Sequence, residues 1–227
     1  MEEVHPDDYA FNRSFFLAFS FTAAQTSSRN VANNTSEFTQ DKQGAGNQKS
    51  SEQIQASLKA HQHEFDYLLG DWEFTAENRE AGKFRGYWSA LRLPETGQIM
   101  DEFRIVFDSG ETYFVSTTWR AYNAILDRWE LVSVDNKGTG LQNFGTAHLE
   151  GSEMHIEQKF GFGTPTSWIS RIRYYNIQAN SFSWISDRSL DGGKTWIKDF
   201  QKIEERRIGP PRSLEPQTPP KKSARAS

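Results

Sequence analysis

Aromatic and β-branched residues alternate with polar ones in ten successive segments, and this period of two predicts strands. The predicted strands are residues 71–78, 84–93, 98–108, 111–121, 127–135, 140–149, 153–160, 167–177, 181–187 and 195–206. Most are separated by turn-forming residues, as at Pro94 to Gly97 and Asn136 to Gly138. Because no helical segment interrupts them, they predict an antiparallel meander. The expected fold is all-β, with one closed barrel of about eight to ten strands.

The segments that flank the strands have a different pattern. Ile54, Leu58 and Phe65 are spaced as on a helix, so we expect a short helix ahead of the first strand. Residues 25–57 are rich in Ser, Thr, Asn and Gln, a composition typical of disorder. We therefore expect a mostly disordered extension over residues 1–57, a barrel over residues 58–208, and a disordered tail over residues 209–227.

Composition removes several classes of function. The chain has no cysteine, which excludes disulfides, thiolate metal sites and a cysteine nucleophile. Residues 64–208 carry 22 acidic and 17 basic side chains, a net charge of −5, so we expect no nucleic-acid partner. No apolar run is long enough for a transmembrane helix. Residues 15–24 are apolar enough for an export signal, but the preceding segment is acidic, which favours the cytoplasm.

Two motifs give the chain a resemblance to a known family. They are Phe65-Asp66-Tyr67-Leu68-Leu69-Gly70-Asp71-Trp72-Glu73-Phe74 and Ser170-Arg171-Ile172-Arg173-Tyr174-Tyr175, the second followed by Phe182-Ser183-Trp184 and by Ser189-Leu190-Asp191-Gly192-Gly193-Lys194-Thr195-Trp196. Together they resemble a bacterial family of lipocalin-like (calycin-type) domains of unknown function, over residues of about 63–207. The resemblance implies a lipocalin-like barrel and a small apolar ligand, but it supplies no catalytic residues.

The same resemblance suggests how one end of the barrel is closed. In lipocalin-like folds the tryptophan of the Gly-x-Trp motif packs against a basic residue after the last strand. Here Trp72 would meet Arg206 or Arg207 in a cation–π contact. The related haem-binding barrels need a histidine on a late strand, and this chain has none after His155. We therefore expect neither haem nor any other cofactor, and no metal site.

One further motif has a familiar form. Ser189, Asp191, Gly193 and Thr195 match the Asp-box hairpin of sialidase-type propellers. A single copy in a chain of this length cannot build a propeller. We interpret the segment as a hairpin in which glycines supply positive φ angles.

Charged residues within aromatic strands are the candidates for a site. Alternation places Glu102 and Arg104 on one face of their strand, and Arg171 and Arg173 on one face of another. If either face points inward, the charges must be paired with each other or must receive an anionic ligand. Four tryptophans could line the same cavity or fill a core. The candidate ligand-binding residues are Trp88, Glu102, Arg104, Trp119, Trp129, Arg171, Arg173 and Trp184.

These candidates support three functions. The first is a non-catalytic barrel that binds a small hydrophobic or aromatic molecule, which could be anionic. The second is a cyclase or isomerase, with Glu102 as the candidate base and Arg104 or Arg171 stabilising negative charge. The third is a protein-interaction module that works through its tails and outer surface. The sequence leaves the ligand, the strand register and the oligomeric state open.

Overall fold

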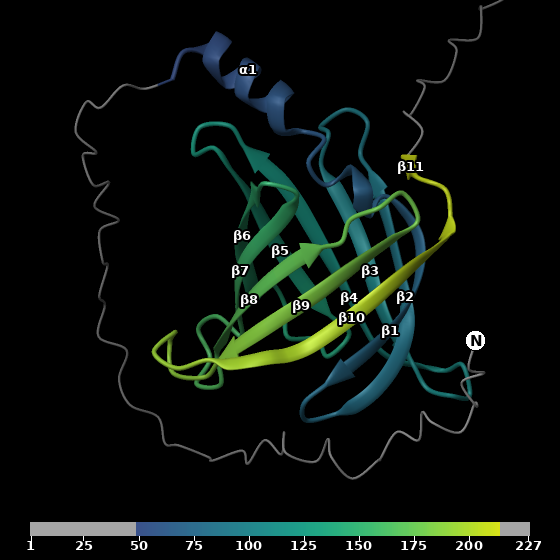
Figure 1. The fold of residues 1–227 in the computed structure, drawn as a ribbon. Helices are drawn as coiled ribbons and strands as arrows, with labels where there is room; N and C mark the ends of the chain where they lie inside the picture. The colour runs from purple at the N-terminus through teal and green to yellow at the C-terminus, as the bar shows by residue number, and fades with distance from the viewer. Residues whose placement is uncertain (1–48, 214–227) are drawn as a thin grey trace, which may run out of the picture.

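The fold is a closed antiparallel β-barrel, seen in a computed structural model that describes residues 49–213 (Figure 1). The elements are α1 (Ser51–His61), the 3-10 turn η3 (Asp66–Leu68), β1 (Gly70–Asn78), β2 (Gly82–Arg92), β3 (Ile99–Val106), β4 (Thr112–Asn123), β5 (Arg128–Asp135), β6 (Asn143–Glu150), β7 (Glu153–Phe160), β8 (Trp168–Tyr175), β9 (Ser181–Ser189), β10 (Ile197–Gly209) and β11 (Arg212–Ser213). Consecutive strands from β1 to β10 pair with one another, and β1 also pairs with β10. The predicted all-β barrel with a short N-terminal helix is confirmed.

The helix starts ahead of the expected domain boundary at residue 58. Ser50 caps it: the Ser50 hydroxyl accepts from the Gln53 backbone N–H at 3.3 Å, and the Gln53 side chain accepts from the Ser50 N–H at 2.8 Å. No residue of α1 is buried. It is held instead by polar contacts with the β4–β5 turn, such as that from the Ser57 hydroxyl to Asp127 at 2.6 Å.

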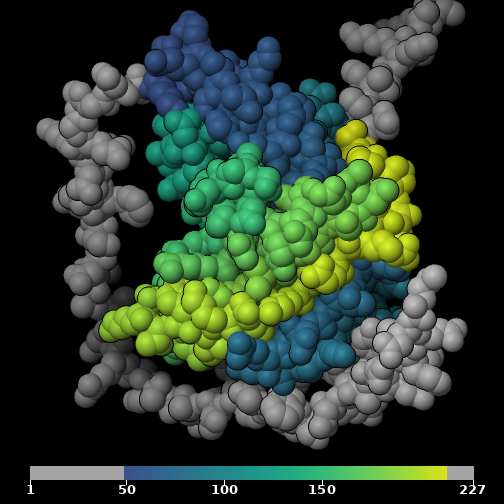
Figure 2. Space-filling view, in the orientation of Figure 1, coloured from purple at the N-terminus to yellow at the C-terminus, as the bar shows by residue number. Residues whose placement is uncertain are grey.

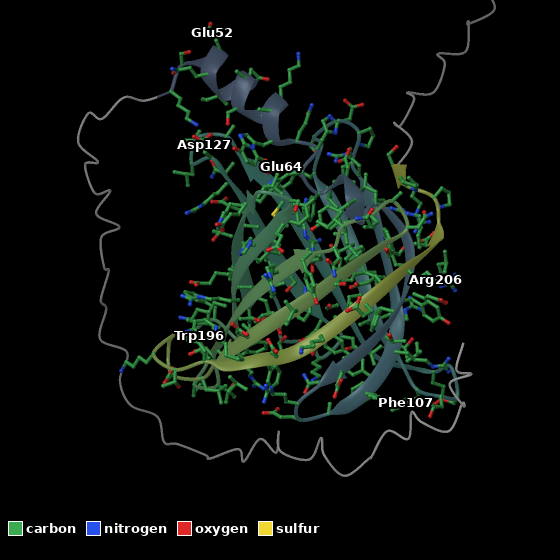
Figure 3. All side chains as sticks on the ribbon, in the orientation of Figure 1. Glu52, Glu64, Phe107, Asp127, Trp196 and Arg206 are labelled. Carbon is green, nitrogen blue, oxygen red and sulfur yellow. The ribbon has the colours of Figure 1, made fainter. Side chains whose placement is uncertain are left out.

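The chain between α1 and β1 covers one end of the barrel, which we call the helix end (Figure 2). Phe65 and Leu68 are fully buried there and pack on the aromatic core. The opposite end, which we call the far end, carries the turns with Phe107 and Trp196 (Figure 3).

The segment between α1 and β1, which we call the plug, is fastened at the helix end by Trp72 and Arg207. The Arg207 guanidinium lies 3.9 Å from the centroid of the buried Trp72 ring, which confirms the expected cation–π contact and selects Arg207 over Arg206. Arg207 also donates to the backbone carbonyls of Leu69, Tyr67 and Ala179. Gly70 has a φ of 111°, and a Cβ there would come 2.5 Å from an Arg207 nitrogen. Glycine is therefore required for the close approach.

At the far end, the Asp191 segment forms the expected hairpin. Asp191 accepts from the backbone N–H groups of Lys194 and Thr195, and from the Thr195 hydroxyl at 2.6 Å. These hydrogen bonds, above all the one from the Thr195 hydroxyl, hold the pKa of Asp191 at about 2. Gly192 and Gly193 have the positive φ angles that the turn needs.

The described chain extends slightly beyond the expected barrel. After β10, the two residues of β11 pair in parallel with β2. The expected disordered tails and the apolar segment 15–24 otherwise lie outside the described residues. Within residues 49–213, no helix is both long and apolar enough to cross a membrane.

Candidate functional site

Strand alternation and register define which side chains point into the barrel. The inward series on β3 is Ile99, Asp101, Phe103 and Ile105, because Ile99 and Asp101 are buried while their neighbours are not. Paired residues on adjacent strands share a face, so Arg120 on β4, opposite Ile99, also points inward. These inward positions hold charged groups as well as apolar ones.

An ion pair lies inside the barrel. Asp101 and Arg120 are each 3% exposed, and a guanidinium nitrogen of Arg120 contacts a carboxylate oxygen of Asp101. The second carboxylate oxygen accepts from the Trp88 indole N–H at 2.9 Å. The Arg120 guanidinium also lies 5.3 Å from the centroid of the Phe65 ring. The two charges balance each other, as buried charges must, while the Arg120 Nε–H has no hydrogen-bond partner among the described residues.

A second carboxyl group is buried without such a partner. Glu205 on β10 is 3% exposed and lies in register with Phe74 on one side and Phe182 on the other. Neither of its carboxyl oxygens meets a hydrogen-bond partner among residues 49–213. Burial raises the pKa of Glu205 well above its usual range, and the nearby Glu204 adds to the effect. Glu205 therefore stays neutral at a pH where an exposed glutamate is ionised.

Two tyrosines connect the ion pair with Glu205. Burial raises the pKa of Tyr67, and raises that of Tyr174 to about 12. Arg120 and Glu205 also influence the pKa of both hydroxyls, Arg120 lowering it and Glu205 raising it, which places these groups in one electrostatic neighbourhood. We call Asp101, Arg120, Glu205, Tyr67 and Tyr174 the interior polar cluster. Within the described part of the chain, the buried Tyr67 hydroxyl lacks a hydrogen-bond partner.

Some inward side chains beyond the polar cluster are less buried than those beside it. On β3, Asp101 is buried, whereas Phe103 and Ile105 beyond it are only half-buried. On β9, the inward-facing Phe182 is buried and the next inward side chain, Trp184, is half-buried. These three side chains pack against the aromatic core and still keep part of their surface exposed.

The inward face of the barrel beyond the polar cluster also carries small polar residues. Ser133, Gln158, Ser170 and Ser186 are inward-facing and buried. Gln158 donates to the Ser133 hydroxyl at 3.2 Å, and the Ser170 hydroxyl donates to a backbone carbonyl at 3.1 Å. An apolar cavity with a few fixed polar groups is typical of small-molecule sites.

The predicted arginine and glutamate candidates lie on the outer surface. Glu102 and Arg104 do share a face, and they pair with each other there, with side chains 43% and 44% exposed. Arg171 pairs with Glu157 at 3.1 Å and Arg173 with Glu153 at 3.3 Å. The alternation correctly places Glu102 with Arg104, and Arg171 with Arg173, on one face of their strands. On both strands, however, it is the opposite face that points into the barrel. Interior charge comes from Asp101, Arg120 and Glu205 instead.

The four candidate tryptophans divide into three groups. Trp88 and Trp184 point inward, and Trp88 contacts Tyr174 and Phe182 through ring centroids 6.0 and 6.1 Å apart. Trp129 also points inward, but it is 1% exposed and donates to Glu64 at 3.0 Å as part of the plug. Trp119 lies on the outer face, where its indole N–H donates to Gln98 at 2.8 Å.

The outer surface also carries a groove, of about 390 Å³, across strands β5 to β8. Its charged lining includes Arg128 and Glu130, which pair with each other at 2.8 Å. Glu157 in the same groove is already paired with Arg171. In the described residues, no group of three or more His, Asp or Glu side chains is placed to hold a metal ion. The interior therefore offers the stronger candidate site.

The contribution of Glu205 to the pH dependence of the barrel's stability can be measured. The unfolded chain releases this proton at the ordinary glutamate pKa of 4.5, whereas the folded barrel retains it to a higher pH. The stabilising effect of the protonated group is therefore complete below the pKa of the unfolded state. It is lost as pH rises toward the pKa of the folded state. While only the folded state holds the proton, the loss is about 1.4 kcal/mol per pH unit. Urea unfolding, repeated as pH is raised above 4.5, should show this slope in the wild type and not in Glu205→Gln. Equal slopes would contradict a buried neutral Glu205.

Comparisons with known proteins add structural likenesses of low identity. No family model matches the chain, and no curated protein matches it. Among solved structures, it is similar to the S-type phycobiliprotein lyase CPES from Guillardia theta, with 11% identity and a TM-score of 0.45 over 63% of this chain and 90% of that one. It is also similar to EF1p2_mFAP2b bound to DFHBI, with 12% identity and a TM-score of 0.33 over 65% of this chain and 98% of that one. The chain's own strand pairing and its Trp72–Arg207 closure make the fold a lipocalin-like barrel.

Proposed function

We propose that the barrel binds one small, largely apolar or aromatic molecule in its interior. The observation that carries this proposal is the incomplete burial of two inward-facing rings. Phe103 and Trp184 point into the barrel and remain half-buried, whereas the inward-facing ring of Phe182 is 1% exposed. A molecule bound beside Phe103 and Trp184 would cover aromatic surface that the protein leaves exposed.

The ligand would lie between these rings and the interior polar cluster. Trp88 and Trp184 are the candidate tryptophans that remain as proposed contacts. Glu205 and Tyr67 add hydrogen-bonding groups that the protein itself leaves unused among residues 49–213. Buried polar groups in native proteins are nearly always satisfied, so these two indicate a place for a bound molecule.

A fluorescence titration of the full chain tests the proposal. Prodan, an uncharged aromatic ketone, shifts its emission to shorter wavelengths when it leaves water. We expect a saturable shift that corresponds to one site. Trp184→Ala should weaken the affinity by about tenfold, because a large aromatic contact is lost.

The matched control is Trp119→Ala, which removes the same ring from the outer face. This variant should keep the wild-type affinity. An equal loss in both variants, or no saturable shift in the wild type, would contradict an interior site. Far-UV circular dichroism of each variant should verify that the barrel is intact.

A second candidate function is an isomerase or cyclase, and one observation favours it. Glu205 is a buried neutral carboxyl group in an aromatic cavity, while Asp101 in the same interior is paired with Arg120. Two carboxyl groups held in different environments are the usual arrangement for acid–base chemistry. Glu205, as an acid, would be the candidate catalytic carboxyl group in place of the outward-facing Glu102, which the sequence suggested as a base. Glu205→Gln would then abolish turnover and leave binding unchanged.

A further inference from the structure

The unpartnered groups of the interior polar cluster restrict the chemistry of the ligand. Within the interior polar cluster, three groups that can donate are buried without a hydrogen-bond partner among residues 49–213: the Arg120 Nε–H, the Tyr67 hydroxyl and the carboxyl group of Glu205. The carboxyl group counts as a donor because its proton is retained. Each of the three has an N–H or O–H to donate, so an acceptor on the ligand would satisfy them.

The charges around this position are already balanced. The positive charge of Arg120 is matched by Asp101, and both side chains are 3% exposed. Arg207, another basic residue at the helix end, covers the Trp72 ring and directs its donors to backbone carbonyls. An anion placed beside Glu205 would lose its hydration without gaining an unmatched positive charge, which is costly in a low-dielectric interior.

From the ion pair and the unpartnered donors, we infer that the natural ligand is uncharged at its buried end and presents a carbonyl-type oxygen to Glu205 and Tyr67. This inference rests on the proposed function and narrows its ligand class from apolar or anionic molecules to neutral aromatic ketones, amides and lactams. The apolar part of such a molecule would lie toward Trp184 and Phe103, whose rings are only half-buried.

Three related dyes separate this inference from the proposed function. Prodan carries a ketone on a dimethylaminonaphthalene, dimethylaminonaphthoate carries a carboxylate at the same place, and unsubstituted dimethylaminonaphthalene has neither. All three are titrated into the full-length wild-type chain. We expect prodan to bind about tenfold more tightly than either analogue, the difference that one good hydrogen bond makes.

The variant pair is Glu205→Leu and Glu204→Leu. Glu204 is the adjacent glutamate, and it lies exposed on the outer face of the same strand. Glu205→Leu should remove the preference for prodan over the unsubstituted dye, and Glu204→Leu should retain it. Glu205→Gln, which keeps a neutral donor, should retain part of it.

Each outcome has one meaning. Preference for prodan that disappears only in Glu205→Leu supports the inference. Equal binding of prodan and the naphthoate, or an unchanged preference in Glu205→Leu, overturns the inference. The proposed interior binding site would still stand in either case. A water molecule would then satisfy Glu205. If none of the three dyes binds, the proposed function fails together with the inference.

Discussion

Replacing Asp101 by asparagine is expected to lower the free energy of unfolding by about 3–5 kcal/mol, because it leaves the Arg120 charge buried and unpaired. Arg120 is 3% exposed and has no other carboxylate within ion-pair distance among the described residues. Trp88 would also lose the charged acceptor of its indole N–H. Urea denaturation followed by tryptophan emission measures the change.

The control is Glu102→Gln, one residue along the same strand. Glu102 makes the corresponding ion pair with Arg104, but on the outer face with both side chains more than 40% exposed. Exposed pairs contribute little, so a loss of less than about 1 kcal/mol is expected. Comparable losses in the two variants would show that the inward face of β3 has been misassigned.

The second large effect is expected at the plug. Arg207→Ala should cost about 2–4 kcal/mol, because it removes the cation–π contact with Trp72 and the charged hydrogen bonds to three carbonyls. Arg206→Ala is the matched control. Arg206 projects from the outer side of β10, where it pairs with Glu73 (Figure 3).

We expect Arg206→Ala to cost less than about 1 kcal/mol, as for other exposed ion pairs. Thermal unfolding of both variants provides the comparison. If the two arginines proved equally important, the closure of the helix end would depend on the outer salt bridge and not on Trp72.

The strands could be predicted from sequence because turn residues and period-two patterning agree over most of the barrel. All ten predicted segments coincide with observed strands, with boundaries shifted by a few residues. The helix was expected from its apolar spacing, but its start at Ser51 depends on the Ser50–Gln53 capping box, which the apolar spacing does not reveal.

The inward faces were harder to predict. On β8, the apolar Ile172 and Tyr174 alternate with Arg171 and Arg173, so the sequence did contain the signal that these arginines face outward. On β3, Phe103 and Ile105 likewise alternate with Glu102 and Arg104, but the signal is weaker because Asp101 stands on the inward face and Met100 on the outward one.

Two interior charges were missed for similar reasons. At Trp119 and Arg120, hydrophobicity favours the tryptophan as the inward residue, yet register with Ile99 places the arginine inside. Glu205 lies in a run of charged residues with no apolar alternation. Once Arg207 is assigned to Trp72, however, residues 203 and 205 share its face, and this step could have identified Glu205.

A crystal structure of the full chain grown with prodan would show directly whether the barrel binds its ligand in the interior. We expect dye density inside the barrel, with the naphthalene against Trp184 and the ketone oxygen within hydrogen-bond distance of Glu205. Density in the outer groove across β5 to β8, with an interior closed around its own side chains, would contradict it.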